Sequence, residues 1–410
     1  MFSKNNKQGK KVKVAIIGTV GVPANYGGFE TLAEHLIDQM AVTHDITVYC
    51  SGKAYPKKER KSTYKSAKLK YIPLEANGIQ SIIYDTWSII HSLFKSDVLL
   101  VLGVAGAWIL PLVRLLTNKK VIISIDGIEW KRDKWNLLAK CYLFWAESLA
   151  VRYSHVDISD NEVIQNYTST RYGTLSRIIE YGADHTIKVP INQESQAKYN
   201  FLNHPYAFKV CRIEPENNVH QILEVFAKNA THIPFVIVGN WDKSDYGKKL
   251  KNDYSGFEHI HILDPIYDQQ KLDVLRANAS LYVHGHSAGG TNPSLVEAMY
   301  LGLPILAYGV AYNRVTTENK ALYFNTPTEL KEVLRQIDLT QLKSIGVTME
   351  SIAKRRYTWS KVAKKYENLV EEALVSRGKT NVKSTIEKMD DKDLLSLDIA
   401  HLKINKNFKL

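Results

Sequence analysis

Short apolar runs alternate with longer amphipathic stretches along most of the chain. Residues 12–18, with the sequence VKVAIIG, are apolar and rich in β-branched side chains, which is typical of a strand buried on both faces of a parallel sheet. A glycine-rich turn follows, and residues 30–40 then place their apolar side chains on one stripe, which predicts a helix. Further strands are predicted in this half at residues 45–50, 69–73, 97–102 and 120–125. This alternation predicts a parallel sheet with helices on both faces.

The same rhythm begins again after residue 205. Strands are predicted at 206–211, 234–239, 259–263, 280–284 and 304–308, and helices near 219–228, 269–277 and 293–302. Between the two halves, residues 186–204 are polar, lack clear periodicity and contain Pro190, which predicts a linker. Two α/β halves joined by a linker predict a cleft, and the ligands of open parallel sheets bind beyond the carboxyl ends of the strands.

The chain is therefore expected to fold as an α/β protein with two Rossmann-like domains. The predicted segments are an N-terminal domain at 1–185, the linker at 186–204, a C-terminal domain at 205–355, a helix at 356–375 and a charged tail at 376–410. The most apolar stretch, residues 98–116, is long enough to span a membrane. However, Pro111 and Arg114 interrupt it, and it divides into a strand, a loop and a helix. The basic start of the chain is not expected to be a signal peptide, because no small-residue cleavage site follows it.

The chain is basic, with 54 Lys and Arg residues against 42 Asp and Glu residues and a formal net charge of +12. This balance favours an anionic partner, such as a nucleotide or a membrane surface. The excess cations gather in the N-terminal arm and in the run 53–70, close in sequence to apolar, aromatic stretches at 79–94 and 135–149. That combination suits an anionic bilayer surface, and a solvated loop beside ordinary core helices is the alternative. Because the cations are not interleaved with stacking aromatics, no nucleic-acid partner is expected.

The first motif with chemical content is the turn GTVGVPANYGGFE at residues 18–30. A glycine-rich turn between a strand and a helix lets backbone N–H groups approach a phosphate, and the helix N-terminus adds positive potential. The spacing matches neither the dinucleotide-binding fingerprint nor the P-loop, so neither kind of site is predicted. A tight β–α turn without a ligand is the alternative.

The second motif is HSAGGTNPSLVEAM at residues 286–299. Its two glycines permit close backbone approach to a ligand, Asn292 suits the cap of a helix, and Pro293 suits its first position. The N–H groups of residues 293–295 are then expected to be free to hold a diphosphate without a metal ion. Glu297 lies among apolar side chains, so its charge is expected to need a partner such as a ribose diol. Complementing the helix dipole is the alternative role of this carboxylate.

The third motif, RIEPENN, begins with Arg212 at the end of the first strand of the second half. A guanidinium at the carboxyl end of a strand aims into the predicted cleft and suits bidentate binding of a phosphate. A surface ion pair with Glu214 or Glu216 is the alternative.

The fourth motif, DGIEWKRDKW at residues 126–135, follows the strand predicted at 120–125. Its carboxylates Asp126 and Glu129 are candidates for base catalysis or for binding sugar hydroxyls. Its two tryptophans suit stacking on a sugar, and packing within the domain is an equally good explanation for each.

These four motifs, in this order, resemble those of retaining GT-B glycosyltransferases of the E-x7-E superfamily. They are most similar to those of bacterial polysaccharide rhamnosyltransferases that use dTDP-rhamnose. The resemblance extends over roughly residues 12–375. It implies a GT-B fold, in which two Rossmann-like domains face each other across a cleft and a C-terminal helix crosses back to the first domain. The N-terminal domain is implied to bind the acceptor, and the C-terminal domain the donor nucleotide.

The implied reaction is transfer of L-rhamnose from dTDP-rhamnose to a polyprenyl-diphosphate-linked sugar, GlcNAc or Glc, with retention at the anomeric carbon. Such enzymes make cell-wall or capsular polysaccharide, and the resemblance implies a cytoplasmic protein bound to the inner face of the bacterial plasma membrane. No metal or other cofactor is implied, because protein groups neutralise the diphosphate. The alternatives are transfer of a hexose from a UDP-sugar and a non-catalytic scaffold that binds a nucleotide sugar.

The resemblance also assigns site residues by position. The groups implied to hold the donor diphosphate are Gly27, Gly28, Arg212, Gly290, Thr291, Asn292, Pro293, Ser294 and Leu295. Glu297 matches the glutamate that binds the nucleotide ribose. Asp126 replaces a histidine that contacts the 6-hydroxyl of the donor sugar, and a 6-deoxy sugar has no such hydroxyl. Asp126 and Glu129 are the residues implied to position hydroxyls for catalysis.

Two positions depart from the family pattern. Gly289 stands where the first Glu of E-x7-E is expected, which removes a carboxylate near the anomeric carbon. Asn217, assigned to the donor site by its position, stands where a Lys usually supports Arg212. Arg212 and backbone N–H groups are then left to neutralise the leaving diphosphate.

Overall fold

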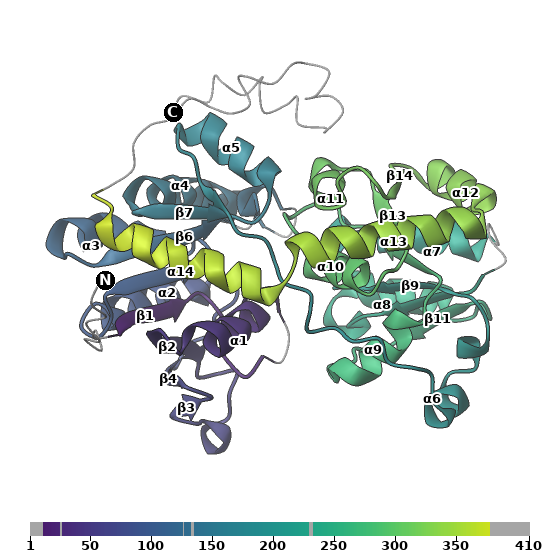
Figure 1. The fold of residues 1–410 in the computed structure, drawn as a ribbon, viewed down its shortest axis with the longest axis horizontal. Coiled ribbons are helices and arrows are strands. Elements are labelled where there is room, and N and C mark those ends of the chain that lie inside the picture. Colours follow the sequence, from purple (N-terminus) through teal and green to yellow (C-terminus); the bar gives the residue numbers. More distant parts are fainter. Residues whose placement is uncertain (1–10, 25–26, 126, 133–134, 229–232, 378–410) are drawn as a thin grey trace, which may run out of the picture. The chain divides into compact units, whose positions relative to one another are not determined.

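The computed structural model describes residues 11–24, 27–125, 127–132, 135–228 and 233–377, and it holds two β-sheets with helices packed around them (Figure 1). The first sheet has eight strands, in the order β3 (Thr63–Tyr64), β4 (Ala67–Ile72), β2 (His44–Ser51), β1 (Val12–Ile17), β5 (Val98–Leu102), β6 (Lys120–Ile125), β7 (Val156–Ser159) and β8 (Arg177–Ile178). Strand β3 pairs antiparallel with β4, whereas β1 pairs in parallel with β2 on one side and β5 on the other. The switch point of this Rossmann-like sheet therefore lies between β1 and β5.

The strands of this sheet form where the sequence buries both faces. All five residues of β5 are buried, as are the last four of β1. A continuous apolar run of this kind is what a parallel strand needs when helices cover both of its faces. The helices of this part are α1 (Gly28–Met40), α2 (Gln80–Ser92), α3 (Leu110–Leu116), α4 (Leu137–Tyr153) and α5 (Glu162–Tyr172).

The second sheet is parallel throughout. Its six strands run in the order β11 (Ile260–Leu263), β10 (Phe235–Val238), β9 (Ala207–Val210), β12 (Leu281–His284), β13 (Ile305–Tyr308) and β14 (Leu322–Phe324). Numbered along the chain, this is the Rossmann order with the switch point between β9 and β12. Its core includes the stacked rings of Phe226 and Phe235, whose centroids lie 4.4 Å apart.

The helices after β8 that the structure describes are α6 (Gln193–Lys198), α7 (Val219–Ala227), α8 (Asp245–Tyr254), α9 (Gln269–Ala277), α10 (Pro293–Tyr300), α11 (Ala311–Thr316), α12 (Pro327–Gln336), α13 (Leu339–Arg356) and α14 (Trp359–Val375). Four of them, α7, α9, α10 and α14, coincide with predicted helices. Helix α6 lies in the segment predicted as a linker, where Asn192 and Ser195 form a reciprocal capping box. Capping therefore creates a short helix where the sequence shows no periodicity.

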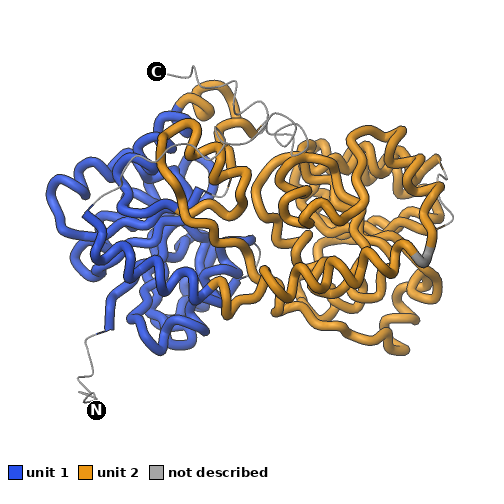
Figure 2. Tube along the Cα trace, turned by 45° about the horizontal axis from the view of Figure 1, so that its top comes forward, with its two compact units in different colours: residues 1–125, 142–157, 363–380 blue, residues 126–141, 158–362, 381–410 orange. Residues whose placement is uncertain are grey.

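The chain separates into two compact units, shown in different colours in Figure 2. Unit 1 comprises residues 1–125, 142–157 and 363–380, and unit 2 comprises residues 126–141, 158–362 and 381–410. The glycine-rich turn at 18–30 belongs to unit 1. The motifs that begin at residues 126, 212 and 286 belong to unit 2.

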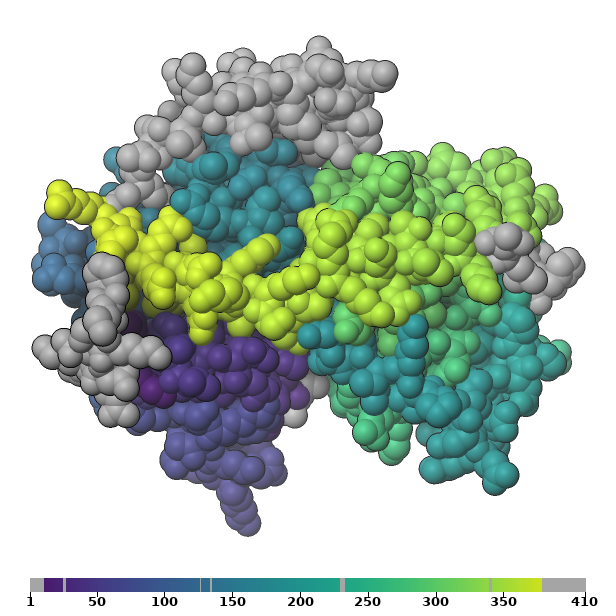
Figure 3. All heavy atoms as spheres, in the orientation of Figure 1, coloured from purple at the N-terminus to yellow at the C-terminus, as the bar shows by residue number. Residues whose placement is uncertain are grey.

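The C-terminal helix returns to the unit that holds β1, as expected from the resemblance to the GT-B fold. From residue 363 onwards α14 belongs to unit 1, and it forms part of the surface seen in yellow in Figure 3. Lys120 Nζ donates to the carbonyl of Ser376 at 2.6 Å, and Thr43 Oγ1 donates to Glu367 Oε1 at 3.0 Å. These contacts fasten both ends of the returning segment to unit 1.

The apolar stretch at 98–116 divides as predicted. It forms β5, a loop with a short 3-10 turn at Ala107–Ile109, and α3. Among the residues that the structure describes, no helix combines the length and the apolar character needed to cross a bilayer.

Candidate functional site

The glycine-rich turn in unit 1 is organised by Glu30, on the first turn of α1. Glu30 Oε1 accepts hydrogen bonds from the N–H of Val20 at 2.7 Å and from Thr19 Oγ1 at 2.9 Å. Gly27 has φ 134°, and a Cβ at this position would overlap Glu30 Oε2. A glycine is therefore required at position 27, and the N–H of Val20 is already used within the protein. Gly28 is the first residue of α1.

The start of α10 in unit 2 has the predicted cap. Asn292 Oδ1 accepts the N–H of Ser294 at 3.1 Å, and Pro293 occupies the first helical position. The expectation that the N–H groups of residues 293–295 are free is wrong. Proline has no N–H, the cap uses that of Ser294, and the N–H of Leu295 donates to the Asn292 carbonyl at 3.1 Å.

Gly290 and Thr291, before this cap, pack against Asp160, which directly follows β7. Asp160 Oδ2 accepts the N–H of Thr291 at 2.9 Å, and the Thr291 hydroxyl donates to the Asp160 carbonyl. A Cβ on Gly290 would overlap Oδ1 of the same carboxylate. The predicted diphosphate loop is thus built against an acidic side chain, and Gly290 is needed for that close approach. Sequence reasoning did not find Asp160, which carries no motif of its own.

Glu297, on the second turn of α10, belongs to a buried ionic network. Its Oε1 accepts from His185 Nε2 at 3.2 Å, and its Oε2 pairs with Nη1 of Arg276 on α9. Arg276 also donates through Nη2 to Asp273 Oδ1 at 2.6 Å, and the side chains of this second pair are fully buried. Trp359 Nε1 donates to His185 Nδ1 at 3.0 Å, which leaves Nε2 as the donor toward Glu297.

The protein itself therefore supplies Glu297 with two partners, Arg276 and His185, that the sequence did not predict. Burial alone would raise the pKa of Glu297, but Arg276 and His185 outweigh it and lower the pKa to about 2. The carboxylate is ionised at neutral pH, and its side chain remains 14% exposed. The assignment of Glu297 to a nucleotide ribose stays a prediction. The sequence signal for this network was a pair of opposite charges, Asp273 and Arg276, that are three residues apart in an otherwise apolar stretch.

Glu129 and the two glutamates of the third motif meet at Arg132. Arg132 Nη1 lies 3.1 Å from Glu129 Oε2, and Nη2 lies 2.8 Å from Glu216 Oε1 and 3.4 Å from Glu214 Oε2. Glu129 Oε1 also accepts from Trp135 Nε1 at 2.9 Å. The carboxylate of Glu129 is thus held in a fixed orientation by two side chains of its own motif. Glu214 and Glu216 both pair with Arg132, and the binding of a phosphate by Arg212 stays a prediction.

The loop that carries Arg212 is braced by Asn217. The buried Asn217 amide donates through Nδ2 to the carbonyl of Arg212 at 2.7 Å, while the Arg212 side chain is exposed. The next residue, Asn218, has φ 50° and donates to the carbonyl of Gly285 at 2.9 Å. Asn217 thus acts within the protein as a brace, and its contact with a donor stays a prediction. Asp126 lies outside the described residues.

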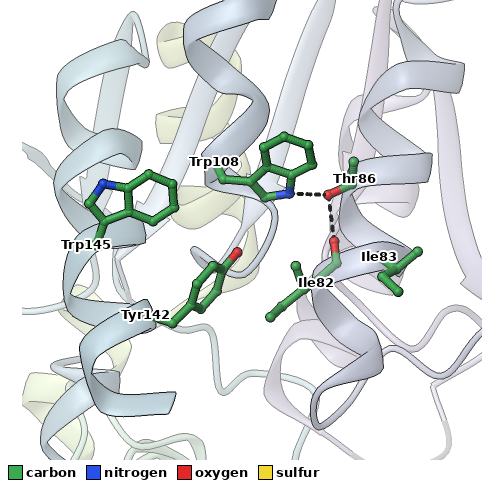
Figure 4. Close-up of a pocket in the computed structure, with 6 residues that line it drawn as sticks. All are labelled: Ile82, Ile83, Thr86, Trp108, Tyr142 and Trp145. Carbon is green, nitrogen blue, oxygen red and sulfur yellow. Dashed lines mark hydrogen bonds between the residues drawn. The ribbon is translucent and has the colours of Figure 1, made fainter. Parts of the chain in front are cut away.

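An apolar pocket lies in unit 1 (Figure 4). It has a volume of about 370 Å³ and is lined by Ile82, Ile83, Thr86, Trp108, Tyr142 and Trp145. The indole of Trp108 donates to Thr86 Oγ1 at 2.8 Å, and that hydroxyl donates to the Ile82 carbonyl at 2.6 Å. The Tyr142 hydroxyl donates to the carbonyl of Ala105 at 2.5 Å, so these polar atoms are engaged within the protein and the lining is apolar. In the described ranges, no group of three or more His, Cys, Asp or Glu side chains is arranged to hold a metal ion.

Two family models match separate ranges of the sequence. Residues 191–340 match the family model described as glycosyl transferases group 1, and residues 11–184 match a domain of unknown function, DUF1972. The second half of the chain is therefore similar to the group 1 glycosyl transferases. None of the curated proteins matches the sequence.

Solved structures are similar over almost the whole fold. Sucrose-phosphate synthase from Thermosynechococcus elongatus is 14% identical with a TM-score of 0.75, and the match covers 88% of this chain and 99% of that one. A glycosyltransferase from Rickettsia africae is 14% identical with a TM-score of 0.67, over 89% and 99% of the two chains. HepE from Anabaena, in complex with UDP, is 12% identical with a TM-score of 0.66, over 88% and 100%. The chain therefore has the GT-B fold of two Rossmann-like domains.

Proposed function

We propose that the chain is a glycosyltransferase that transfers L-rhamnose from dTDP-rhamnose, with retention, to a sugar linked to a polyprenyl diphosphate. Its product would be cell-wall or capsular polysaccharide. The observation that carries the proposal is the start of α10, where a glycine turn, a capped helix and the ionised Glu297 follow the carboxyl end of β12. This strand borders the switch point of the second sheet, where Rossmann sheets bind their ligands.

The nature of the donor is supported from two directions. HepE, which shares the fold, was solved in complex with UDP and with UDP-glucose, so a nucleoside diphosphate sugar suits this architecture. The choice of dTDP-rhamnose depends on the four motifs and on Asp126 at the position of a histidine that recognises a 6-hydroxyl. Calorimetric titration with dTDP-rhamnose, UDP-glucose and UDP-GlcNAc tests it. Tighter binding of a UDP-sugar would favour a hexosyltransferase instead, and binding of none would overturn the proposal.

The proposed transfer depends on neutralising the charge of the leaving diphosphate. Arg212 neutralises charge on the leaving diphosphate, whose oxygen accepts the proton of the acceptor hydroxyl as that hydroxyl attacks from the same face. Glu129, held by Arg132 and Trp135, positions a hydroxyl of donor or acceptor. The test is incubation with dTDP-rhamnose and a GlcNAc-diphosphate-lipid in the presence of EDTA. Release of dTDP with a rhamnosylated product is expected, and the absence of both would contradict a metal-independent transfer.

A non-catalytic nucleotide-sugar-binding protein is the second candidate. It is favoured by Gly289, which stands where the family carries a glutamate. Such a protein would bind the donor in calorimetry and release no dTDP in the incubation. The two measurements together therefore separate the candidates.

For the acceptor, we propose that unit 1 docks on the anionic inner face of the plasma membrane. Helix α2 is amphipathic in reverse: its buried residues include Asp85, Ser88 and Ser92. Its exposed apolar residues, which recur every three or four positions along the helix and its flanks, are Ile79, Ile83, Trp87, Ile90 and Phe94. An apolar stripe facing solvent suits the interfacial region of a bilayer, and the pocket beside it suits the isoprenoid chain of a lipid-linked sugar.

A further inference from the structure

Three basic side chains of unit 2, near the carboxyl ends of β9 and β12, carry nitrogen atoms that have no hydrogen-bond partner in the described part of the chain. Lys209 is 0% exposed, and its Nζ has no hydrogen-bond partner among the described residues. Both ring nitrogens of His284, which is also 0% exposed, and Nδ1 of His286 likewise lack a partner with hydrogen-bond geometry among the described residues, although the nearby Asn313 side chain acts to raise the pKa of His284. Buried polar atoms are nearly always satisfied, because an unsatisfied one is costly. We therefore expect these three groups to have a function.

The three residues form a column from the core toward the surface, which we call the basic column. The rings of His284 and His286 stack with their centroids 4.3 Å apart and an angle of 11° between their planes. Lys209 Nζ lies 3.3 Å from the point that a Cβ on Gly285 would occupy, directly between the two histidines in sequence. His286 is half-buried and the other two are fully buried, so His286 is the outermost member.

The charged groups that face the column are mainly cations. Arg212 and Arg132 both contribute to lowering the pKa of His286. The carboxylates nearest in sequence to Arg212, Glu214 and Glu216, pair with Arg132. Two further groups beside the column, Cys211 and Tyr282, are uncharged at neutral pH because burial raises the pKa of each. Arg212 and Arg132 therefore add to the effect of burial and disfavour protonation of His286 when no anion is bound.

Burial disfavours the charged form of each member of the column. Burial lowers the pKa of Lys209, and burial together with Lys209 and the neighbouring cations lowers the pKa of His284 and His286 well below the usual range. An anion close to these groups favours their charged forms and raises each pKa again. The column is thus able to gain positive charge in response to an anionic ligand.

We propose that the basic column takes up protons when the diphosphate of a nucleotide sugar binds at the carboxyl ends of β9 and β12. The inference rests on the proposed function, because the ligand is the donor. The proposal also explains how the diphosphate is neutralised without the lysine that Asn217 replaces. The protonated groups of the basic column supply the missing positive charge, and they do so only when the donor is bound. The bound state is the protonated one, so donor affinity rises as pH falls. Uptake of one proton corresponds to about tenfold in affinity per pH unit at most.

Calorimetry measures the uptake directly. A nucleotide sugar, dTDP-rhamnose or UDP-glucose, is titrated at pH 7.5 in PIPES, HEPES and Tris, whose ionisation enthalpies differ. The diphosphate of a nucleotide sugar is esterified at both ends and does not titrate near neutrality, so a dependence of the measured enthalpy on the buffer reports protons bound by the protein. We expect net uptake for the full chain and tighter binding at pH 6.5 than at pH 8.

Matched variants identify the groups responsible. His286→Gln and Lys209→Met are each expected to reduce the uptake and to flatten the pH dependence, while His204→Gln, an exposed histidine, leaves both unchanged. If Lys209→Met fails to fold, His286→Gln alone decides. Binding without net proton uptake, or uptake that persists in both variants, would overturn the proposal and leave the proposed function standing. Failure of every nucleotide sugar to bind would instead contradict the proposed function.

Discussion

At the scale of single residues, the site depends on charges that the protein pairs internally. Glu297 and Asp273 are both bound by Arg276, whose side chain is fully buried. Removing one member of a buried ion pair leaves the other charge without compensation, which typically costs about 3–5 kcal/mol. Arg276→Met is therefore expected to lower the free energy of unfolding by that amount in urea titrations at pH 7.

The matched control is Lys271→Met on the same helix. Lys271 pairs with Asp268 at 3.7 Å, and the two side chains are 71% and 51% exposed. Exposed pairs of this kind contribute about 0–1 kcal/mol, so a small change is expected. Equal losses in the two variants would show that the buried network is not specially stabilising. Because the pKa of Glu297 is lowered to about 2, its share of the stabilisation is present above about pH 4.5 and is lost as pH falls toward 2.

Gly290 provides a test of the loop before α10. A Cβ at this position would overlap Asp160 Oδ1, so Gly290→Ala is expected to displace the loop and weaken nucleotide-sugar binding at least tenfold, roughly 1.4 kcal/mol. Gly256→Ala is the control, because a Cβ there meets nothing within 4 Å. Calorimetric affinities decide between them, with circular dichroism to confirm that both variants fold. Unchanged affinity in Gly290→Ala would place the diphosphate away from this loop.

Some of these residues were visible in the sequence and others were not. The cap at Asn292 and the ionised Glu297 were predictable, because both follow from a short local pattern. Asp160 was not, since its contact with Thr291 joins positions 131 residues apart. The partner of Glu297 was missed for the same reason, because pairing across helices α9 and α10 is set by packing. Local patterns thus predicted the residues that a helix start requires, and tertiary contacts decided what those residues bind.

At the scale of elements, the start of α10 links stability to binding. Asn292→Ala removes the cap and is expected to cost about 1 kcal/mol of stability in urea unfolding. Ser244→Ala removes the equivalent cap of α8, where Ser244 Oγ accepts the N–H of Gly247 at 3.1 Å, and should cost a similar amount. Only Asn292→Ala is expected to weaken nucleotide-sugar binding, measured by calorimetry. Equal affinities in the two variants would separate the α10 cap from the donor site.

The elements themselves were largely predictable, because most obey simple periodicities. Strands β1, β5 and β10 are short apolar runs buried on both faces, and the turns that follow these strands carry glycine or proline. Two elements were not predictable in this way. Helix α6 depends on a capping box within a polar segment. Helix α2 turns several apolar residues toward solvent while it buries Asp85, Ser88 and Ser92 together with Tyr84 and Ile89. In α2, the usual rule that apolar positions mark the buried face would therefore place the exposed stripe in the core.

At the scale of the whole molecule, the basic charge and the exposed face of α2 predict a membrane contact that depends on salt. Each Lys or Arg near an anionic surface contributes about 1 kcal/mol, and ions screen this attraction beyond about 10 Å at 0.1 M salt. The chain, with its net charge of +12, is therefore expected to float with vesicles that contain phosphatidylglycerol at low salt and to dissociate at high salt.

The apolar contribution separates this binding from simple charge attraction. The double variant Ile83→Ser, Trp87→Ser removes two exposed apolar side chains from α2 and keeps the net charge, so a large loss of flotation at low salt is expected. Val347→Ser is the control, because Val347 is also exposed, at 64%, but lies on α13 in unit 2. If both variants float like the unchanged chain, charge alone holds the protein at the vesicle and α2 does not enter the bilayer. If the unchanged chain does not float at low salt, unit 1 does not dock on anionic membranes, and the reversed face of α2 must be covered by another partner.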